Sequence, residues 1–178
     1  MRNSRKLAGL AVGAIAVSVG AFGAVGASAG GKHCKQNKCH PIIKEGRMTG
    51  KGTIDSAYGR SHHVFRNSVC NSDKFHDLKV MWEGNRFDLK AYSTPLMCLD
   101  TPADEGQPKA GFDTIVGQGT GVLNGQSGAS ARFRFTDAGE PGRNDTATIT
   151  IVDPAGNVVF QLTDAKILEG GNHQAHRK

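Results

Sequence analysis

The chain has 178 residues, with 22 Lys and Arg against 16 Asp and Glu, and a formal net charge of +6. Three of the basic residues precede position 30, so the chain beyond it holds 19 basic and 16 acidic residues, a net charge of +3. So small an excess, scattered along the chain, argues against nucleic acid as a partner. The 149 residues after position 29 suit one domain with a single core.

The first 29 residues have the pattern of a signal peptide. Arg2, Arg5 and Lys6 precede an uncharged run over residues 7–27, and small residues at 27–29 form a cleavage site. A retained membrane anchor is the alternative, since about 20 apolar residues span a bilayer. Gly and Ala dominate the run, however, and no basic cluster follows it directly. We therefore expect a secreted protein, periplasmic if the envelope has an outer membrane, with no stable membrane insertion after cleavage.

Residues 30–45 are predicted to be a polar, cysteine-containing N-terminal extension, because they lack an apolar period. Cys34, Cys39 and His40 give C-x4-C-H, a spacing variant of the covalent haem motif. Haem would need an apolar pocket that a basic segment lacks. A metal site using these three residues and His33 is a second alternative. The sequence favours a local disulfide between Cys34 and Cys39.

Four cysteines allow three pairings in an exported chain. We predict a disulfide between Cys70 and Cys98, because both lie inside the patterned region. Closing a loop of 28 residues would stabilise the fold by roughly 3 to 4 kcal/mol.

From residue 46 onward, apolar residues alternate in short runs bounded by Gly, Pro, Asn and Asp, a pattern typical of strands. Two-residue turns are expected at Gly84-Asn85 and Asn124-Gly125, a five-residue turn at 153–157, and a long surface loop over 94–111. The expected strands cover residues 47–55, 63–70, 78–83, 87–91, 112–123, 131–135, 146–151, and 158–162 leading into a final strand near Ile167.

One of these strands carries two arginines that alternate with two phenylalanines, in the order Arg132, Phe133, Arg134 and Phe135. Alternation places the two arginines on the solvent face and the phenylalanines on the core face. About eight strands at this spacing predict an all-β fold, an antiparallel β-sandwich of jelly-roll-like or Ig-like type over residues 46–169. Residues 170–178 are expected to form a flexible polar tail.

Several short motifs together resemble a known bacterial domain. They are GRMTG (46–50), Cys70, GNRF (84–87), Cys98, GFDT (111–114), LNG (123–125), DAGEPGRND (137–145) and GNHQAH (171–176). The set, spanning about 130 residues, is similar to the post-COAP-1 domain of secreted or surface-tethered bacterial proteins. The resemblance implies an all-β extracellular module of unassigned function and carries no catalytic residues.

The densest group of oxygen-bearing side chains lies at Asp137, Glu140, Asn144 and Asp145, in a segment shaped by Gly and Pro. Oxygen ligands close in sequence suit Ca²⁺, although the spacing is not that of an EF-hand. The alternative is that Asp and Asn accept local backbone hydrogen bonds in a turn. A weak metal site at His173 and His176, with His62 and His63, is also considered, against a solvated terminus.

Catalytic motifs are absent. The sequence has no G-x-S-x-G elbow and no H-E-x-x-H, and the carboxylates that could flank a sugar are Asp100, Asp104, Glu105 and Asp113. We therefore expect no enzyme and no firm cofactor, and we predict a secreted binding or structural module whose partner is an unknown envelope protein or glycan. The alternatives are a polysaccharide hydrolase and a Ca²⁺-dependent carbohydrate-binding module.

Overall fold

A computed structural model describes residues 33–35, 38–40, 42–43, 45–73, 77–101 and 110–177, with side chains from residue 45 onward. The chain divides into two units between Gly31 and Lys32, and all described residues belong to the second unit. The expected signal peptide lies outside the described residues. So do the side chains of Cys34 and Cys39, although the backbone register pairs these two residues.

The described chain is all-β, with antiparallel pairing throughout and no helix, which confirms the predicted class. β1 and β2 form a two-stranded sheet, and the other eleven strands form a second sheet. The strands are β1 (His33–Lys35), β2 (Lys38–His40), β3 (Ile42–Ile43), β4 (Arg47–Ser56), β5 (Gly59–Val69), β6 (Leu78–Trp82), β7 (Asn85–Tyr92), β8 (Met97–Leu99), β9 (Thr114–Leu123), β10 (Gln126–Thr136), β11 (Thr146–Val152), β12 (Val158–Ile167) and β13 (Gly170–His176).

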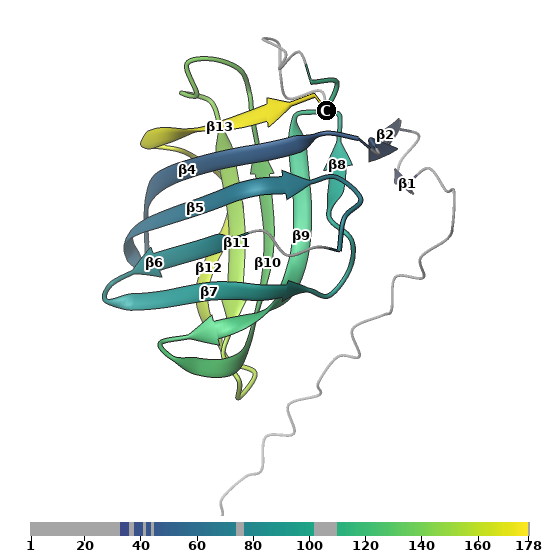
Figure 1. Ribbon diagram of the computed structural model, residues 1–178. Helices are drawn as coiled ribbons and strands as arrows, with labels where there is room; N and C mark the ends of the chain where they lie inside the picture. Colours follow the sequence, from purple (N-terminus) through teal and green to yellow (C-terminus); the bar gives the residue numbers. More distant parts are fainter. Residues whose placement is uncertain are drawn as a thin grey trace, which may run out of the picture. The chain divides into compact units, whose positions relative to one another are not determined.

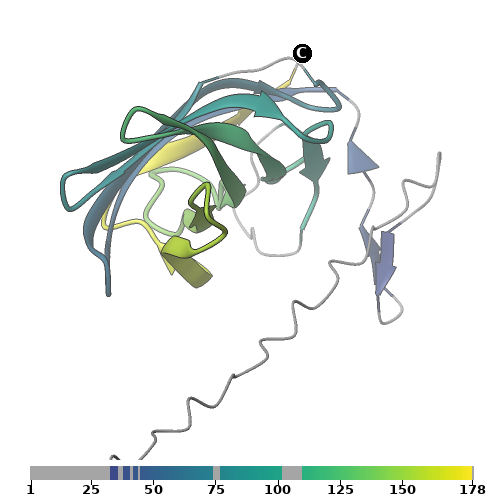
Figure 2. The ribbon, with the colours of Figure 1, turned by 90° about the horizontal axis from the view of Figure 1, so that it is seen from below.

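The large sheet has the order β12-β11-β10-β9-β7-β6-β5-β4-β13, and β3 and β8 join it along β9. Strands β4–β7 and β13 run across the direction of β9–β12 (Figure 1). Seen from below, the sheet curls into a half-barrel (Figure 2). The hydrogen bonds thus form one continuous curled sheet, and the expected sandwich of jelly-roll or Ig-like type is not confirmed.

Strand β9 joins the two flanks of the sheet. It pairs with β10 along its length, with β7 through its second half and with β8 through its first half. Its core-facing positions are Ile115 and then three glycines, at 117, 119 and 121. A Cβ at Gly117 would lie 2.8 Å from Leu96 and from a ring atom of Phe133. The glycines therefore let side chains of both flanks approach the β9 backbone closely.

The core fills the inside of the curl with aromatic side chains from both flanks. Phe65 of β5 stacks on Phe135 of β10 with ring centroids 4.5 Å apart, and Trp82 of β6 packs on Phe160 of β12 at 4.8 Å. On β10, Arg132 and Arg134 are exposed while the alternating Phe133 and Phe135 are buried, as predicted. Such aromatic contacts between distant strands hold the two flanks together.

Three local expectations differ from the structure. The β6–β7 turn is Glu83-Gly84 rather than Gly84-Asn85, and both turn residues have positive φ, of 40° and 77°. The 94–111 segment includes β8, whose Cys98 is fully buried. The expected flexible tail is strand β13, paired with β4 over seven residues. Hydrogen bonds to polar groups hold β13 in the sheet, and a search for alternating apolar residues does not detect such a strand.

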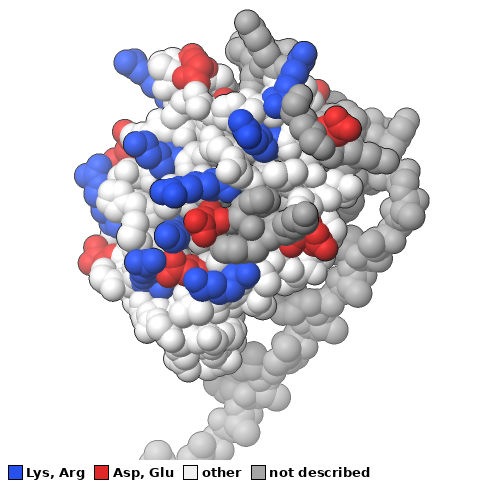
Figure 3. Space-filling view, viewed as in Figure 1, with Lys and Arg blue, Asp and Glu red and all other residues white. Residues whose placement is uncertain are grey.

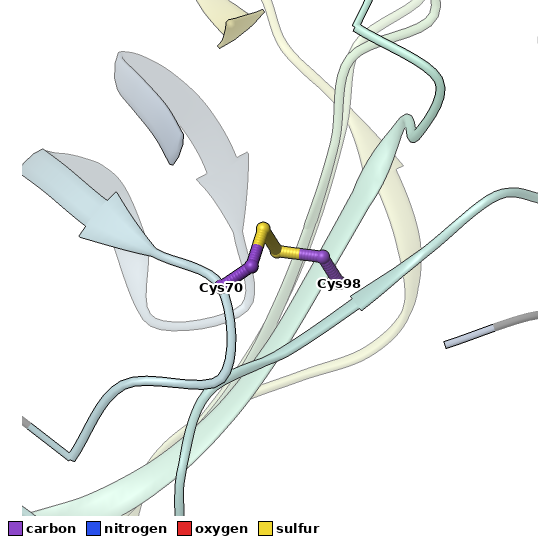
Figure 4. Close-up of a disulfide and its surroundings, with 2 residues drawn as sticks. All are labelled: Cys70 and Cys98. Carbon is purple, nitrogen blue, oxygen red and sulfur yellow. A yellow bond between two sulfur atoms is a disulfide. The ribbon is translucent and has the colours of Figure 1, made fainter. Parts of the chain in front are cut away.

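The predicted disulfide between Cys70 and Cys98 is present (Figure 4), with Cα atoms 5.4 Å apart. Cys70 follows β5 and Cys98 lies in β8, and the neighbouring Asn71 N–H donates to the Leu96 carbonyl at 2.7 Å. The bridge therefore ties the end of one flank to a strand on β9.

Removing this disulfide should destabilise the fold. We expect the double variant Cys70→Ala/Cys98→Ala to lose about 3 kcal/mol of unfolding free energy, because its unfolded chain is no longer constrained by the 28-residue loop. Urea unfolding of both proteins at pH 7 measures the difference. An unchanged midpoint in the double variant would show that the bridge is not a structural constraint.

Candidate functional site

The segment between β10 and β11, residues 137–145, is called the clamp loop here. It contains the four oxygen-bearing residues singled out in the sequence. Asp137 and Asp145 are buried, and each uses one carboxylate oxygen inside the loop. Asp137 Oδ1 accepts from the Gly139 N–H at 2.9 Å, and Asp145 Oδ1 accepts from the Ala138 N–H at 2.9 Å. The carboxylates thus fold the loop on itself, as Asp side chains do in turns.

The second oxygen of each carboxylate binds the edge strand β13. Asp145 Oδ2 accepts from the His173 N–H at 2.6 Å, and Asp137 Oδ2 accepts from the Ala175 N–H at 2.8 Å. These two N–H groups belong to alternate residues of a strand whose other side pairs with β4. The clamp loop therefore supplies the acceptors that a further strand would otherwise supply.

Glu140 extends the same contact at the surface. Its carboxylate accepts from the side-chain amides of Gln174, at 2.9 Å, and Asn172, at 3.1 Å. These hydrogen bonds lower the pKa of Glu140 from its ordinary value, and the bond from Gln174 has the larger effect. Three acidic residues of the clamp loop thus bind four consecutive residues of β13.

The aspartate oxygens that were expected to bind calcium accept hydrogen bonds from the protein itself. Four backbone N–H groups already occupy the oxygens of Asp137 and Asp145. Across the described ranges no group of three or more His, Cys, Asp or Glu side chains is arranged to hold a metal ion. Asn144 faces a groove instead. Local hydrogen bonding, the alternative considered for this loop, therefore accounts for its two aspartates.

A buried histidine pair lies directly beneath the clamp loop. His63 Nε2 and His173 Nε2 are 2.8 Å apart, and His173 Nδ1 lies 3.0 Å from the Thr136 carbonyl oxygen. A carbonyl only accepts, so His173 Nδ1 carries the hydrogen. Neutral His173 then accepts at Nε2, and His63 must donate from its own Nε2. The network therefore fixes one tautomer for each ring.

Aromatic packing and a glycine create the room for this pair. His63 stacks on Phe135 with ring centroids 4.9 Å apart, and the His173 ring meets the same phenylalanine edge-on at 5.3 Å. A Cβ at Gly52 of β4 would lie 2.5 Å from His63 Cε1. Only glycine at this position leaves space for the imidazole.

Burial disfavours the charged form of both rings. It lowers the pKa of His173 to about 4 and moves the pKa of His63 well below its ordinary value, with the neighbouring His173 as a second cause for His63. Burial also raises the pKa of Asp145 to about 6, against the opposing effect of the hydrogen bonds from the His173 and Ala138 N–H groups. The pair is thus neutral at pH 7, and the adjacent carboxylate is ionised.

The histidines proposed as a weak metal site do not come together as a set. His173 and His176 are three residues apart on a strand, so they point to opposite faces. His176 Nε2 lies 3.2 Å from Thr49 Oγ1, and His62 Nδ1 lies 3.0 Å from Thr53 Oγ1. Only His63 and His173 meet. In the sequence, His63 shares the parity of Phe65 and so the core face of β5, but no local pattern indicates its partner His173.

A groove of about 810 Å³ runs along the outer side of the clamp loop and strands β10–β12. It combines a cation at Arg134, hydroxyl groups on β11, an amide at Asn144 and an apolar side chain at Ile167, which is 58% exposed. Its lining residues are Arg134, Thr136, Ala138, Gly139, Glu140, Asn144, Thr146, Thr148, Ala165 and Ile167. This mixture offers hydrogen bonds, charge and apolar contact to one ligand.

Of the four carboxylates proposed for hydrolysis, the structure describes only Asp100 and Asp113. Asp113 is fully buried, and its Oδ2 accepts from the Thr101 backbone N–H at 3.0 Å and hydroxyl at 2.7 Å. Asp104 and Glu105 lie outside the described residues. Trp82 is 5% exposed and packs in the core, so its rings are not free to stack on a sugar.

Comparison with protein-family models, with curated proteins and with solved structures finds no match for this chain. Within the ranges described here, no helix is long and apolar enough to cross a membrane. The geometry of the clamp loop, the histidine pair and the groove is therefore the basis for assigning a function.

The clamp loop should contribute measurably to stability. We expect Asp145→Asn to lose about 1 to 3 kcal/mol of unfolding free energy at pH 7, because one amide oxygen replaces two carboxylate oxygens and a buried N–H loses its acceptor. Urea unfolding, with hydrogen exchange at the His173 amide, measures both effects. Glu140→Gln is the control and should change stability by less than about 0.5 kcal/mol, since Glu140 is exposed. Equal losses in both variants would contradict a buried clamp.

Acidification should destabilise the protein through the histidine pair. The unfolded chain binds protons at both histidines near pH 6.5, while the folded pair does not, so stability falls as pH drops from about 6.5 to 4. Asp145 opposes this, because its folded pKa of about 6 exceeds its ordinary 3.8 and stability from this group rises on acidification. Burial also raises the pKa of Asp113, which acts in the same direction as Asp145. We expect a net loss of stability, because the pKa values of both histidines lie far below their ordinary value.

Urea unfolding at pH 7, 5.5 and 4.5 tests this balance. His63→Gln should flatten the loss of stability between pH 7 and 4.5, and Asp145→Asn should make it steeper. Identical pH profiles for the parent protein and His63→Gln would contradict a neutral buried pair.

Proposed function

We propose that the protein is a secreted, non-catalytic all-β module that binds an envelope glycan or envelope protein at the bacterial cell exterior. The signal-peptide pattern and the Cys70–Cys98 disulfide support an oxidising location outside the cytoplasm. The resemblance to the post-COAP-1 domain, carried by motifs that include Cys70, Cys98 and residues 137–145, supports the same assignment. A two-layer, sandwich-like description fits the way β5 and β6 pack on β10 and β12.

The observation that carries the proposal is the groove beside the clamp loop. Its walls come from three strands and from a loop whose carboxylates are fixed by backbone hydrogen bonds, so the groove is preformed. A preformed site loses little conformational entropy when a ligand binds. Threonine hydroxyls, Asn144 and Arg134 would recognise hydroxyl, amide or anionic groups of an extended polymer, and Ile167 would contact its apolar faces.

Pull-down with isolated envelope glycans and with envelope proteins tests the groove. We expect the variant Arg134→Ala/Asn144→Ala to lose at least about 90% of captured ligand, since two polar contacts of about 1 kcal/mol or more each would be removed. Arg132→Ala is the matched control, because Arg132 lies two residues away on the same face and does not line the groove. Capture that is equal in all three proteins would contradict the groove as the binding site.

The same assay separates the two alternatives. A Ca²⁺-dependent carbohydrate-binding module would capture glycan with calcium and release it in excess chelator. A polysaccharide hydrolase would liberate reducing sugar from the glycan. We expect capture without calcium and no liberated sugar, because Asp137, Asp145 and Asp113 are buried in hydrogen bonds to the protein itself.

A further inference from the structure

The second surface of interest is the outer side of strands β4–β7, called the basic face here. Side chains on these strands alternate between the core and solvent, and every charged side chain of the four strands points outward. The cations are Arg47, Lys51, Arg60, Arg66, Lys79, Arg86 and Lys90, and the only carboxylates within the strands are Asp55 and Asp88. Seven cations against two carboxylates give +5, which exceeds the +3 of the whole chain beyond residue 29.

Ion pairing neutralises only part of this face. Arg60 Nε lies 3.8 Å from Asp55, and Arg86 Nε lies 2.7 Å from Asp88. The hydrogen bond from Arg86 is the main cause of the lowered pKa of Asp88, and Lys90 and Lys79 add to it through their charges. Among the residues that the structure describes, the other five cations, Arg47, Lys51, Arg66, Lys79 and Lys90, form no ion pair with a carboxylate.

The sheet register aligns two of these five cations across the strands, and places Asp88 of β7 opposite the second, Lys79. Lys51 of β4 lies opposite Val64 of β5, which in turn lies opposite Lys79 of β6. Two strand spacings therefore separate Lys51 from Lys79, about 10 Å, while residues two apart on one strand are about 7 Å apart. Lysines and arginines gather over β4–β7 in the space-filling view (Figure 3). A polymer lying across the strands would meet several cations at once.

The chemistry of the face selects among polyanions. Single-stranded nucleic acid is bound by aromatic side chains on which bases stack. The outward apolar side chains of β4–β7 are Val64, Val69, Met81 and Ala91, and none is aromatic. Met81, 40% exposed, is the only large exposed hydrophobic residue of the face, which gives little apolar surface for insertion into a lipid bilayer. An anionic polysaccharide, whose charged groups stay hydrated, requires neither aromatic side chains for stacking nor an apolar surface for insertion.

We propose that the basic face of β4–β7 binds an anionic polysaccharide through the carboxylate, sulfate or phosphate groups of its sugars. The free lysines and arginines supply the attraction, and release of counterions makes the affinity depend on salt. This surface is separate from the groove beside the clamp loop, so failure at one surface leaves the other untouched.

Titration of the full secreted chain with dextran sulfate, polygalacturonate and neutral dextran tests the proposal. We expect binding to at least one of the two polyanions and none to dextran. The affinity should fall about tenfold or more between about 50 and 200 mM salt. Binding to dextran sulfate alone would assign the face to sulfate or phosphate esters, and binding to polygalacturonate as well would extend it to carboxylates.

The decisive comparison uses two variants of equal charge. Lys51→Gln/Lys79→Gln/Lys90→Gln should bind about tenfold or more weakly, with a shallower salt dependence. Arg132→Gln/Arg143→Gln/Lys166→Gln removes the same charge elsewhere and should stay within about twofold of the parent. Five of the six residues are exposed and Lys79 is half-buried, and equal unfolding midpoints confirm that both variants fold.

Three results would overturn the proposal. The first is an equal loss of affinity in the two variants, which would mean that net charge alone drives binding. The second is equal affinity for dextran and the polyanions. The third is binding to single-stranded DNA or to vesicles of anionic lipid with no binding to either polysaccharide, which would assign the face to a different class of partner.

Discussion

The free edge of β13 presents backbone N–H groups that need acceptors, and Asp137 and Asp145 meet that need from a loop rather than from another strand. An unpaired edge invites pairing with other chains, and a buried N–H without an acceptor is costly. The two carboxylates resolve both problems. They also fix the clamp loop, because their other oxygens bind backbone N–H groups within it.

The histidine pair depends on this arrangement. With β13 held in place, His173 reaches His63 across β4, and glycine at position 52 leaves the space between them. The result is a polar contact inside an aromatic core, in which both ring nitrogens of His173 are hydrogen-bonded and both rings are neutral at physiological pH. Buried hydrogen bonds of this kind favour one packing of the strands that share them.

The net charge of the chain is small, but the fold concentrates positive charge on one face. Counted along the chain beyond residue 29, the excess of +3 is small. Strand alternation sends every charged side chain of β4–β7 to one side, where cations outnumber carboxylates by seven to two. Two surfaces of different character follow, a mixed groove on β10–β12 and a cationic face on β4–β7.

Local pattern alone determined much of this protein: the all-β class, the Asn124-Gly125 turn, the opposite faces of Arg132 and Phe133, and the pairing of Cys70 with Cys98. Alternation and turn chemistry act between near neighbours, so the sequence displays them. Tertiary structure decided that the strands form one curled sheet, that residues 170–176 are an edge strand, and that Asp145, His173 and His63 meet. These contacts join residues 28 to 110 positions apart through hydrogen bonds, and no periodicity in the chain records such partners.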